Sequence, residues 1–467
     1  MNTKNFLSAF IICAYAISFC AAQTTTKAIT TTCRMLNPIC PPGVYIADPA
    51  VRVMPDGKIY LYGSRDEPGN AWCSHSYDIL STGDLVHWHV DQTSFATEGI
   101  GKQTGYTDRI LYAPDCIEHN GKYYLYYSLA GDSKDDEGVA VATSPLGPFK
   151  NGKIIKGIEG IDPSVFIDDD GQAYLFWGQG HARGAKLSKD MMHIEGPIHD
   201  SLLTYEKDTF NEGSSVRKRN GIYYYVYASH VRHGESNCAT LSYATSKHPF
   251  GPYIYRGVII DNWGSGRNLV NNHGCIQEIN GQWYVFYHRP TQASATMRKA
   301  CMEPIHFNKD GFINEVEMTT QGAGGPINPL QRMDAARACL MSGNVMVTAR
   351  TPAYDIPVEY LAAIRNGDIA WWKYFDFTNK HATRFTCKTW GNNLEATIEI
   401  HLDKPDGELI GTDHLPAMKD ETAYTIHTVP VKKVSGKHAV VLVFKANKAA
   451  DSQKDLLNLE WFEFEQK

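Results

Sequence analysis

Residues 212–228 read EGSSVRKRNGIYYYVYA, in which an Asn-Gly pair separates a short mixed run from a run rich in tyrosine. Asn-Gly or Asp-Gly between two such runs is the strongest short-range signal for a β-hairpin. The same pattern occurs in five segments that align on their turn glycine: 48–64, 112–128, 162–178, 212–228 and 272–288. The sequence therefore predicts five related hairpins, each with an aromatic-rich second strand.

The spacing of these hairpins indicates how they are organised. Their turn glycines lie 50 to 64 residues apart, slightly above the roughly 40 to 50 residues of a usual propeller blade. Segments between the hairpins also repeat, because ATSPLGPF (142–149) resembles ATSKHPFGPY (244–253). We therefore expect an all-β protein in which residues 33–328 form a five-bladed β-propeller. A generic β-sandwich is the alternative, but it would not require five hairpins in phase.

The two ends of the chain do not share the repeat. Residues 1–22 combine a positive start, an apolar run and small residues, which is typical of a signal peptide, and residues 23–32 are a Thr-rich linker. Residues 329–467 contain several short alternating strands, which predict a β-sandwich (jelly-roll) domain. We expect a secreted protein, either extracellular or periplasmic.

Composition limits the partners. The formal net charge is −6 and no basic block is present, which argues against nucleic acid. No segment after the signal peptide is long and apolar enough to cross a bilayer, so no membrane partner is expected. We expect a monomer.

One position of the repeat carries acidic residues. Counting nine residues back from each turn glycine gives Asp48, Tyr112, Asp162, Glu212 and Asn272, with His273 next to the last. Equivalent positions on the innermost strands of a propeller converge on its axis, so the three acids are predicted to face one another. A single Asp before Pro is more often a turn former, and only the shared phase of the three favours a functional site.

Opposed carboxyl groups in an aromatic-lined cleft are the requirement for glycoside hydrolysis. One protonated acid delivers a proton to the leaving oxygen, and one ionised carboxylate handles water or the anomeric carbon. Glu212 precedes an apolar strand whose surroundings keep a carboxyl group protonated near neutral pH, which makes it the candidate general acid.

The segments ADPAV, APD, GIDPSVF, NEGSS and NHG…YHR, in this order, resemble glycoside hydrolase family 43 over about residues 33–328. The resemblance implies a five-bladed propeller that acts on arabinose- and xylose-containing polymers with inversion. By position, it makes Asp48 the general base, Glu212 the general acid and Asp162 the residue that tunes the pKa of Glu212. Inversion requires a water between base and acid, roughly 6.5 to 9.5 Å apart.

The resemblance also implies further site residues. His273 corresponds to a histidine near the propeller axis that in some members helps to hold a calcium or sodium ion in the central channel through water; the chemistry itself requires no cofactor. Arg289 would contact substrate or a catalytic carboxylate. Trp72, Tyr112 and Trp177 are candidate rings for sugar subsites, with core packing as the alternative for each.

The expected activity is removal of terminal α-L-arabinofuranosyl units from the hemicellulose arabinoxylan or from arabinan, polysaccharides of the plant cell wall, or from their oligosaccharides. A β-xylosidase of the same family and a propeller that binds carbohydrate without catalysis are the alternatives.

Residues 329–467 resemble a family 6 carbohydrate-binding module. Asp334 is the one acid where the family has two glutamates, because Ala336 occupies the second place, and this weakens the case for a structural calcium. Tyr424 replaces an expected tryptophan of the sugar cleft, whereas Trp371 and Trp372 are candidate stacking rings. Sugar binding and a purely structural role both remain open for this domain.

Overall fold

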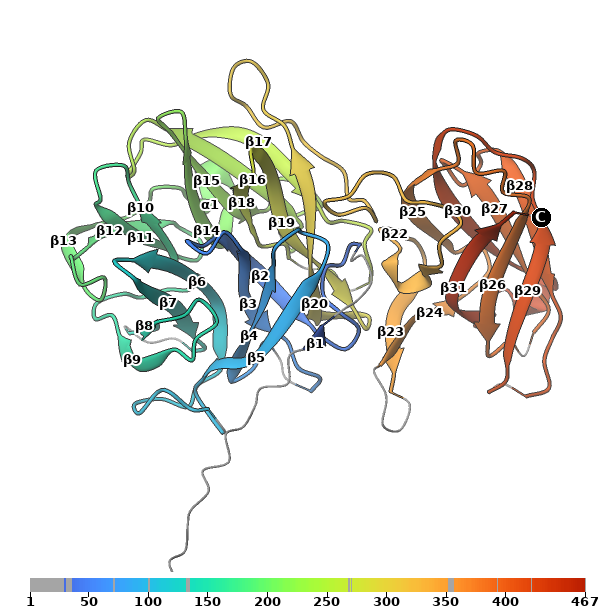
Figure 1. Ribbon diagram of the computed structural model, residues 1–467, viewed down its shortest axis with the longest axis horizontal. Helices are drawn as coiled ribbons and strands as arrows, with labels where there is room; N and C mark the ends of the chain where they lie inside the picture. The colour runs from blue at the N-terminus through green and yellow to red at the C-terminus, as the bar shows by residue number, and fades with distance from the viewer. Residues whose placement is uncertain are drawn as a thin grey trace, which may run out of the picture.

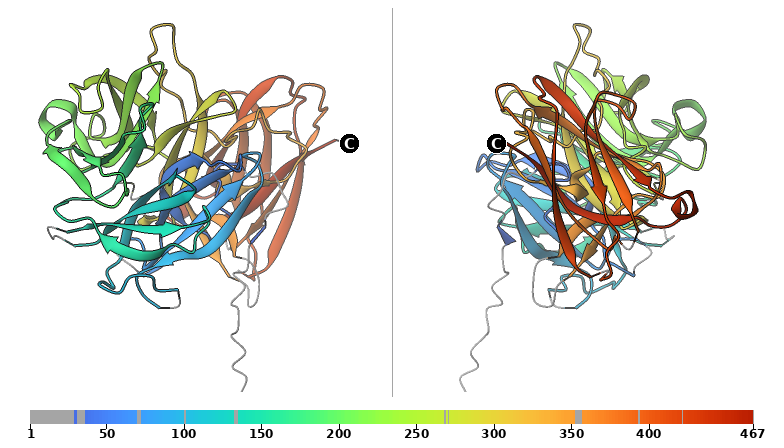
Figure 2. Two further views of the ribbon diagram at one scale, coloured as in Figure 1. Left: turned by 60° about the vertical axis from the view of Figure 1, so that its left-hand side comes forward. Right: turned by 90° about the vertical axis from the view of Figure 1, so that its right-hand side faces the viewer.

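The computed structural model describes residues 29–30, 36–69, 72–99, 101–131, 135–267, 269, 271–351, 357–392, 394–420 and 422–466. The chain is almost entirely β-structure and forms two β domains that lie side by side (Figures 1 and 2). The predicted signal peptide (1–22) and most of the predicted linker (23–32) lie outside the described residues. Within the described part of the chain, no helix is both long and apolar enough to cross a bilayer.

The first domain consists of five antiparallel sheets, which we number along the chain. Sheet 1 contains β1 (Ile29–Thr30), β2 (Ile46–Val53), β3 (Ile59–Arg65), β4 (Ser76–Thr82) and β5 (Trp88–Ala96). Sheet 2 contains β6 (Leu111–His119), β7 (Lys122–Leu129), β8 (Glu137–Ala142) and β9 (Lys150–Ile154), and sheet 3 contains β10 (Ser164–Ile167), β11 (Ala173–Trp177), β12 (Arg183–Leu187) and β13 (Ile194–His199).

The short helix α1 (Tyr205–Asp208) leads into the remaining two sheets. Sheet 4 contains β14 (Phe210–Arg219), β15 (Ile222–Ser229), β16 (Thr240–Ser246) and β17 (Ile254–Asp261). Sheet 5 contains β18 (Cys275–Ile279), β19 (Gln282–Thr291) and β20 (Ser294–Ile305). The first two strands of each repeat pair as antiparallel hairpins, so all five predicted hairpins are present.

The turns and the tyrosine-rich strands have direct physical explanations. Asn220 and Gly221 have φ of 50° and 74°, the left-handed pair that a tight two-residue hairpin requires. Side chains of the second strand alternate between the two faces of a sheet, and both faces are buried: Tyr224 packs between sheets 4 and 5, whereas Tyr225 packs between sheets 3 and 4. The aromatic content therefore fills the space between sheets.

The five sheets share five hydrophobic cores. One core lies between sheets 1 and 2, and the next three join sheets 2 and 3, 3 and 4, and 4 and 5. The fifth core joins sheet 5 back to sheet 1 and contains Phe286 and Met302 together with Val51 and Trp88. Each sheet is therefore buried on both faces, and the first strands of successive sheets are held close together.

The second domain is a sandwich of two sheets. One sheet has the order β23 (Met346–Arg350), β24 (Val358–Ile364), β31 (Leu457–Glu465), β26 (Arg384–Trp390) and β29 (Tyr424–Pro430), with β21 (Met333–Asp334) also on β31. The other has the order β22 (Leu340–Met341), β25 (Ile369–Asp376), β30 (Lys437–Ala446), β27 (Ala396–Leu402) and β28 (Leu409–Leu415). Two 3-10 helices, η1 (Ala335–Arg337) and η2 (Ala449–Asp451), lie in the connections.

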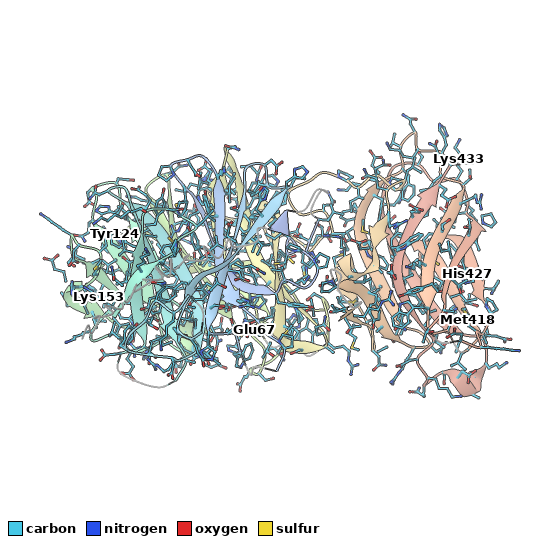
Figure 3. All side chains as sticks on the ribbon, turned by 60° about the horizontal axis from the view of Figure 1, so that its bottom comes forward. Glu67, Tyr124, Lys153, Met418, His427 and Lys433 are labelled. Atoms are coloured by element: carbon cyan, nitrogen blue, oxygen red, sulfur yellow. The ribbon has the colours of Figure 1, made fainter. Side chains whose placement is uncertain are left out.

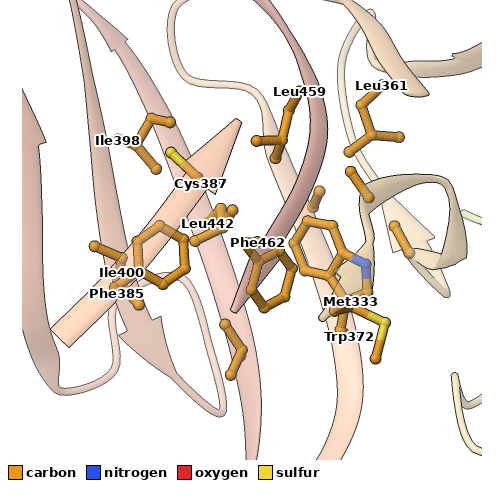
Figure 4. Packing of buried hydrophobic residues seen from close by; sticks show 14 of the residues in the cluster. Met333, Leu361, Trp372, Phe385, Cys387, Ile398, Ile400, Leu442, Leu459 and Phe462 are labelled. Carbon is orange, nitrogen blue, oxygen red and sulfur yellow. The ribbon is translucent and has the colours of Figure 1, made fainter. Parts of the chain in front are cut away.

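One core fills the sandwich. Trp372 packs edge-on against Phe462 with Leu442 and Phe385 nearby (Figure 4). Trp372 is fully buried and so is not available to stack on sugar, whereas Trp371 is partly exposed. Long charged side chains such as Lys153 and Lys433 lie on the surface of the two domains (Figure 3).

Strand β20 joins the two domains through a buried ion pair. Lys299 is 1% exposed, donates to the carbonyl of Pro41 at 2.9 Å and pairs with Glu359 of β24. Glu359 also accepts a bond from the backbone N–H of Gly43. An ion pair taken out of water is strongly destabilised when one member is removed, because the other charge is left uncompensated.

We therefore expect Lys299→Ala to lower the free energy of unfolding by about 3 kcal/mol, measured from guanidinium denaturation curves. Lys404→Ala is the control, because Lys404 and Asp406 form an ion pair that is exposed to solvent and should change stability by less than about 0.5 kcal/mol. Equal effects of the two substitutions would show that the buried pair does not hold the domains together.

Candidate active site

One pocket lies where the first strands of the sheets begin. It has a volume of about 240 Å³ and is lined by Asp48, Trp72, Cys73, Tyr112, Ala113, Ile161, Asp162, Gln179, Glu212, Asn271, His273 and Arg298. The structure thus brings the three predicted acids together, with the predicted residues Trp72, Tyr112 and His273 around them. The pocket is smaller than the roughly 300 to 1,000 Å³ of typical drug-sized sites, and its size suits a single sugar unit.

A repeated β-bulge turns side chains into this pocket. In sheet 1 the pairing advances three residues from Ala47 to Ala50 while the partner strand advances two. The same irregularity occurs in sheet 2 between Leu111 and Pro114, a stretch that includes Tyr112. It occurs again in sheet 4 between Glu212 and Ser215. A bulge changes the direction of the adjacent side chains and interrupts regular pairing. Residues at the same position of the repeat are therefore turned toward the same pocket.

The backbone at two of the three acids adopts a left-handed conformation. Asp48 and Asp162 have φ of 52° and 63°, a region that non-glycine residues rarely occupy outside functional or tightly constrained sites. Gly213 has φ of 77°, and its backbone N–H donates to the carboxylate of Asp162 at 3.1 Å. A Cβ on Gly213 would lie 3.0 Å from the ring of His273. The glycine after Glu212 therefore allows three sheets to approach closely.

Arg298 on β20 is the cation of the pocket, and sequence reasoning missed it. Its guanidinium donates to Asp48 at 2.8 Å and makes two bonds of 2.9 Å to Asp66. The guanidinium also lies over the ring of Trp72, 5.0 Å from its centroid. Arg298 does not belong to the hairpin repeat, so the register that identified the acids could not have pointed to it.

Burial and charge divide the acids into two kinds. Burial favours the neutral form of Asp48, but Arg298 and the nearby imidazoles outweigh it and hold the pKa of Asp48 well below its usual range. Burial raises the pKa of Asp162 well above its usual value, and the charges of Glu212 and Asp48 raise it further. Burial also raises the pKa of Glu212, although a hydrogen bond from Gln179 partly opposes this.

The hydrogen bonds around the acids fit this division. The side-chain amide of Gln179 donates to Glu212 at 2.8 Å. His273 lies 3.5 Å from Asp48 and 3.8 Å from Asp162, and burial lowers its pKa to about 4. The pocket therefore sets one carboxyl group of lowered pKa, Asp48, against two of raised pKa, Asp162 and Glu212, beside an imidazole that is neutral near neutral pH.

Two predicted contacts were wrong. Trp177 is fully buried between sheets 2 and 3, and its indole N–H donates to the carbonyl of Glu159 at 3.1 Å. Arg289 is buried and donates to the carbonyl of Thr319 at 2.6 Å, with Glu303 3.5 Å away. Both residues lie on strands near the pocket. The side chain of Trp177 packs between sheets 2 and 3, and that of Arg289 points to the segment that follows sheet 5.

The residues below the pocket do not fit a directly bound calcium ion. A cavity of about 10 Å³ under His273 is lined mainly by small side chains and prolines, and Asp115 is its one carboxylate. Asp115 is already paired with Arg52. Calcium prefers six to eight oxygen ligands with several carboxylates, and within the described ranges no three His, Cys, Asp or Glu side chains cluster as metal ligands. An ion held through water, as predicted for His273, stays a prediction.

Two known families match the chain in succession. The sequence model of glycosyl hydrolases family 43 matches residues 35–313, and that of carbohydrate binding module family 6 matches residues 334–466. A xylosidase/arabinosidase of Thermoclostridium stercorarium is 32% identical, over 73% of this chain and 82% of the relative. An arabinoxylan arabinofuranohydrolase of Bacillus subtilis is 28% identical, over 90% of this chain and 91% of the relative.

Solved structures agree with these matches. A family 43 arabinoxylan arabinofuranohydrolase from Bacillus subtilis, solved with cellotetraose, aligns with a TM-score of 0.52 at 26% identity, over 92% of this chain and 97% of the other. A β-xylosidase/α-arabinofuranosidase from a compost metagenome aligns with a TM-score of 0.53 at 28% identity, over 62% of this chain and 99% of the other. The predicted family is confirmed: this chain is a member of glycosyl hydrolase family 43 that carries a C-terminal carbohydrate-binding module of family 6.

Proposed function

We propose that this protein is a secreted, inverting α-L-arabinofuranosidase that removes terminal arabinofuranosyl units from arabinoxylan or arabinan. The observation that carries the proposal is the division of the acids in the pocket, where Arg298 lowers the pKa of Asp48 while burial raises the pKa of Glu212. Two carboxyl groups held in opposite states are what an inverting glycosidase requires. The five sheets with five shared cores support a five-bladed propeller as the scaffold.

The proposed reaction uses each acid once. The carboxylate of Asp48 accepts a proton from a water molecule as the water oxygen bonds to the anomeric carbon. Glu212 donates its proton to the glycosidic oxygen as the bond from that oxygen to the anomeric carbon breaks. Asp162 has the proposed role of tuning the pKa of Glu212 and orienting it; it accepts a bond from the backbone N–H of Gly213 and interacts electrostatically with Glu212.

The shape of the pocket and the names of the relatives support the choice of sugar. A volume of about 240 Å³ accommodates one terminal unit rather than a chain. Two relatives aligned over 90% of this chain are named arabinoxylan arabinofuranohydrolases. A β-xylosidase is the second candidate, because a relative from Xylanibacter ruminicola that matches 59% of this chain bears that name.

A panel of aryl glycosides, with arabinoxylan and arabinan, tests the proposal. We expect the highest kcat/KM on the α-L-arabinofuranoside, and release of arabinose whose first-formed anomer, followed by NMR, is inverted. A higher kcat/KM on the β-D-xyloside would support the second candidate. Absence of any hydrolysis would leave a carbohydrate-binding protein without catalysis.

Substitution of the proposed acid should give a response that depends on the leaving group. Glu212→Gln should lower kcat about 10²- to 10⁴-fold on substrates with poor leaving groups, and much less on activated aryl glycosides, which need little protonation. Asp48→Asn should abolish turnover of both, because neither substrate is attacked without the base. Equal losses on both substrate types in Glu212→Gln would show that Glu212 is not the proton donor.

Removal of the guanidinium should move the pH profile. Without Arg298, burial acts on Asp48 with less opposition and raises its pKa, and Asp48 is inactive as a base below that pKa. The acid limb of kcat/KM in Arg298→Met should therefore move to higher pH, measured on an activated aryl glycoside. Arg298→Lys keeps a positive charge and should shift the limb less. An unchanged acid limb in both variants would contradict the role of Arg298.

A further inference from the structure

A second groove lies outside the catalytic pocket, where sheet 4 meets the second domain. It has a volume of about 570 Å³ and is lined by His233, Asp261, Trp263, Glu315, Val316, Glu317, Met318, Leu340 and Lys373. We call it the Trp263 groove. Leu340 and Lys373 belong to β22 and β25, so the groove is formed by both domains.

Trp263 offers a flat apolar surface in this groove. Its side chain is 45% exposed, which is unusual for a residue of this size. The indole stacks on the imidazole of His233, with ring centroids 4.3 Å apart and an interplanar angle of 8°. His233 bonds to Asp261 at 2.7 Å, and the backbone N–H of Trp263 donates to the same carboxylate at 2.9 Å. One face of the indole is therefore covered and held in position, which leaves the other face to contact a ligand.

The polar groups around the indole suit an uncharged, hydroxyl-rich ligand. Each acid of the groove lies beside a cation: Arg232 is 3.5 Å from Asp261 and 2.6 Å from Glu315, and Lys373 is 2.7 Å from Glu317. The side chains of Glu315 and Glu317 remain half-exposed, so their oxygens are free to accept further hydrogen bonds. Three carboxylates beside two cations give the groove no preference for an anionic ligand.

The register of sheet 4 places this groove and the catalytic pocket at the same end of the strands, on opposite edges of the sheet. Glu212 pairs with Ala228, Ala228 with Leu241, and Leu241 with Ile260, one residue before Asp261. This row crosses three strand spacings, about 14 Å in all. A monosaccharide in the pocket cannot reach so far, but an oligosaccharide can.

The loop that carries Trp263 is fixed to the pocket. The side-chain amide of Asn262 donates to the carbonyl of Asn271 at 3.1 Å and to that of His288 at 2.9 Å. Asn271 lines the catalytic pocket, and His288 accepts a bond from the backbone N–H of Asp48. The position of the indole is thereby set relative to the three acids.

We propose that the Trp263 groove binds the backbone of the polysaccharide, with a pyranose ring of a β-1,4-linked xylose chain stacked on the free face of Trp263. The proposal rests on the proposed function for the identity of the chain, and it makes both domains part of one substrate-binding surface. Hydroxyl groups of the chain would donate to Glu315 and Glu317.

Binding of xylohexaose, measured by isothermal titration calorimetry, tests the groove without hydrolysis when every protein carries Glu212→Gln. Adding Trp263→Ala should weaken binding about tenfold, the scale of one lost aromatic contact. Tyr255→Ala is the matched control, because Tyr255 is 38% exposed at the opposite end of β17 and outside the groove. Trp263→Phe retains a ring and should keep most of the affinity.

Three results would overturn the inference: no xylohexaose binding by the parent protein, unchanged affinity in Trp263→Ala, or equal losses in Trp263→Ala and Tyr255→Ala. If Trp263→Ala does not fold, a large loss of affinity in a folded Glu317→Ala protein with Trp263 intact supports the groove, and unchanged affinity there overturns it. The proposed function is tested separately by hydrolysis of the aryl arabinofuranoside, so either idea can fail alone.

Discussion

The site depends on one buried guanidinium placed among buried carboxylates. Arg298 is 2% exposed and contacts Asp48 and Asp66 directly. Charges removed from water are tolerated only when they are paired and fully hydrogen-bonded, and Arg298 meets this requirement for both acids. Because the compensation reaches Asp48 and not Asp162 or Glu212 to the same degree, the pKa values of the acids diverge. The same interaction therefore compensates the buried charge of the pocket and separates the carboxyl groups by pKa, the difference on which the proposed base and acid depend.

Convergence of the acids follows from packing between sheets rather than from any local preference of the chain. Each sheet is buried on both faces, and its first strand lies beside the first strands of its neighbours. The bulges at Ala47–Ala50 and Glu212–Ser215 then turn equivalent residues toward one cavity. Left-handed backbone at Asp48 and Asp162 is a local cost that the surrounding cores and hydrogen bonds offset.

The sequence predicted the site residues that belong to the hairpin repeat and missed those that lie outside it. The Asn-Gly and Asp-Gly turns set the register, and this register identified Asp48, Asp162 and Glu212 together with Tyr112 and His273. Arg298 and Gln179 were missed because they lie outside the repeated hairpins, on β20 and beyond β11. The expectations for Arg289 and Trp177 failed because adjacent residues of a strand point to opposite faces. On β19, His288 contacts Asp48, and its neighbour Arg289 bonds to Thr319 instead.

The alternation of side chains along β20 also connects the second domain to the pocket. Arg298 and Lys299 are neighbours on β20, so their side chains leave the strand on opposite sides. Arg298 points to the acids of the pocket, and Lys299 pairs with Glu359 of the second domain. A second contact lies nearby, where Gln292 bonds to the backbone and side chain of the segment 347–348. Because the sandwich contacts β20 on the side opposite the pocket, the second domain helps to fix the strand that positions Arg298 beside Asp48.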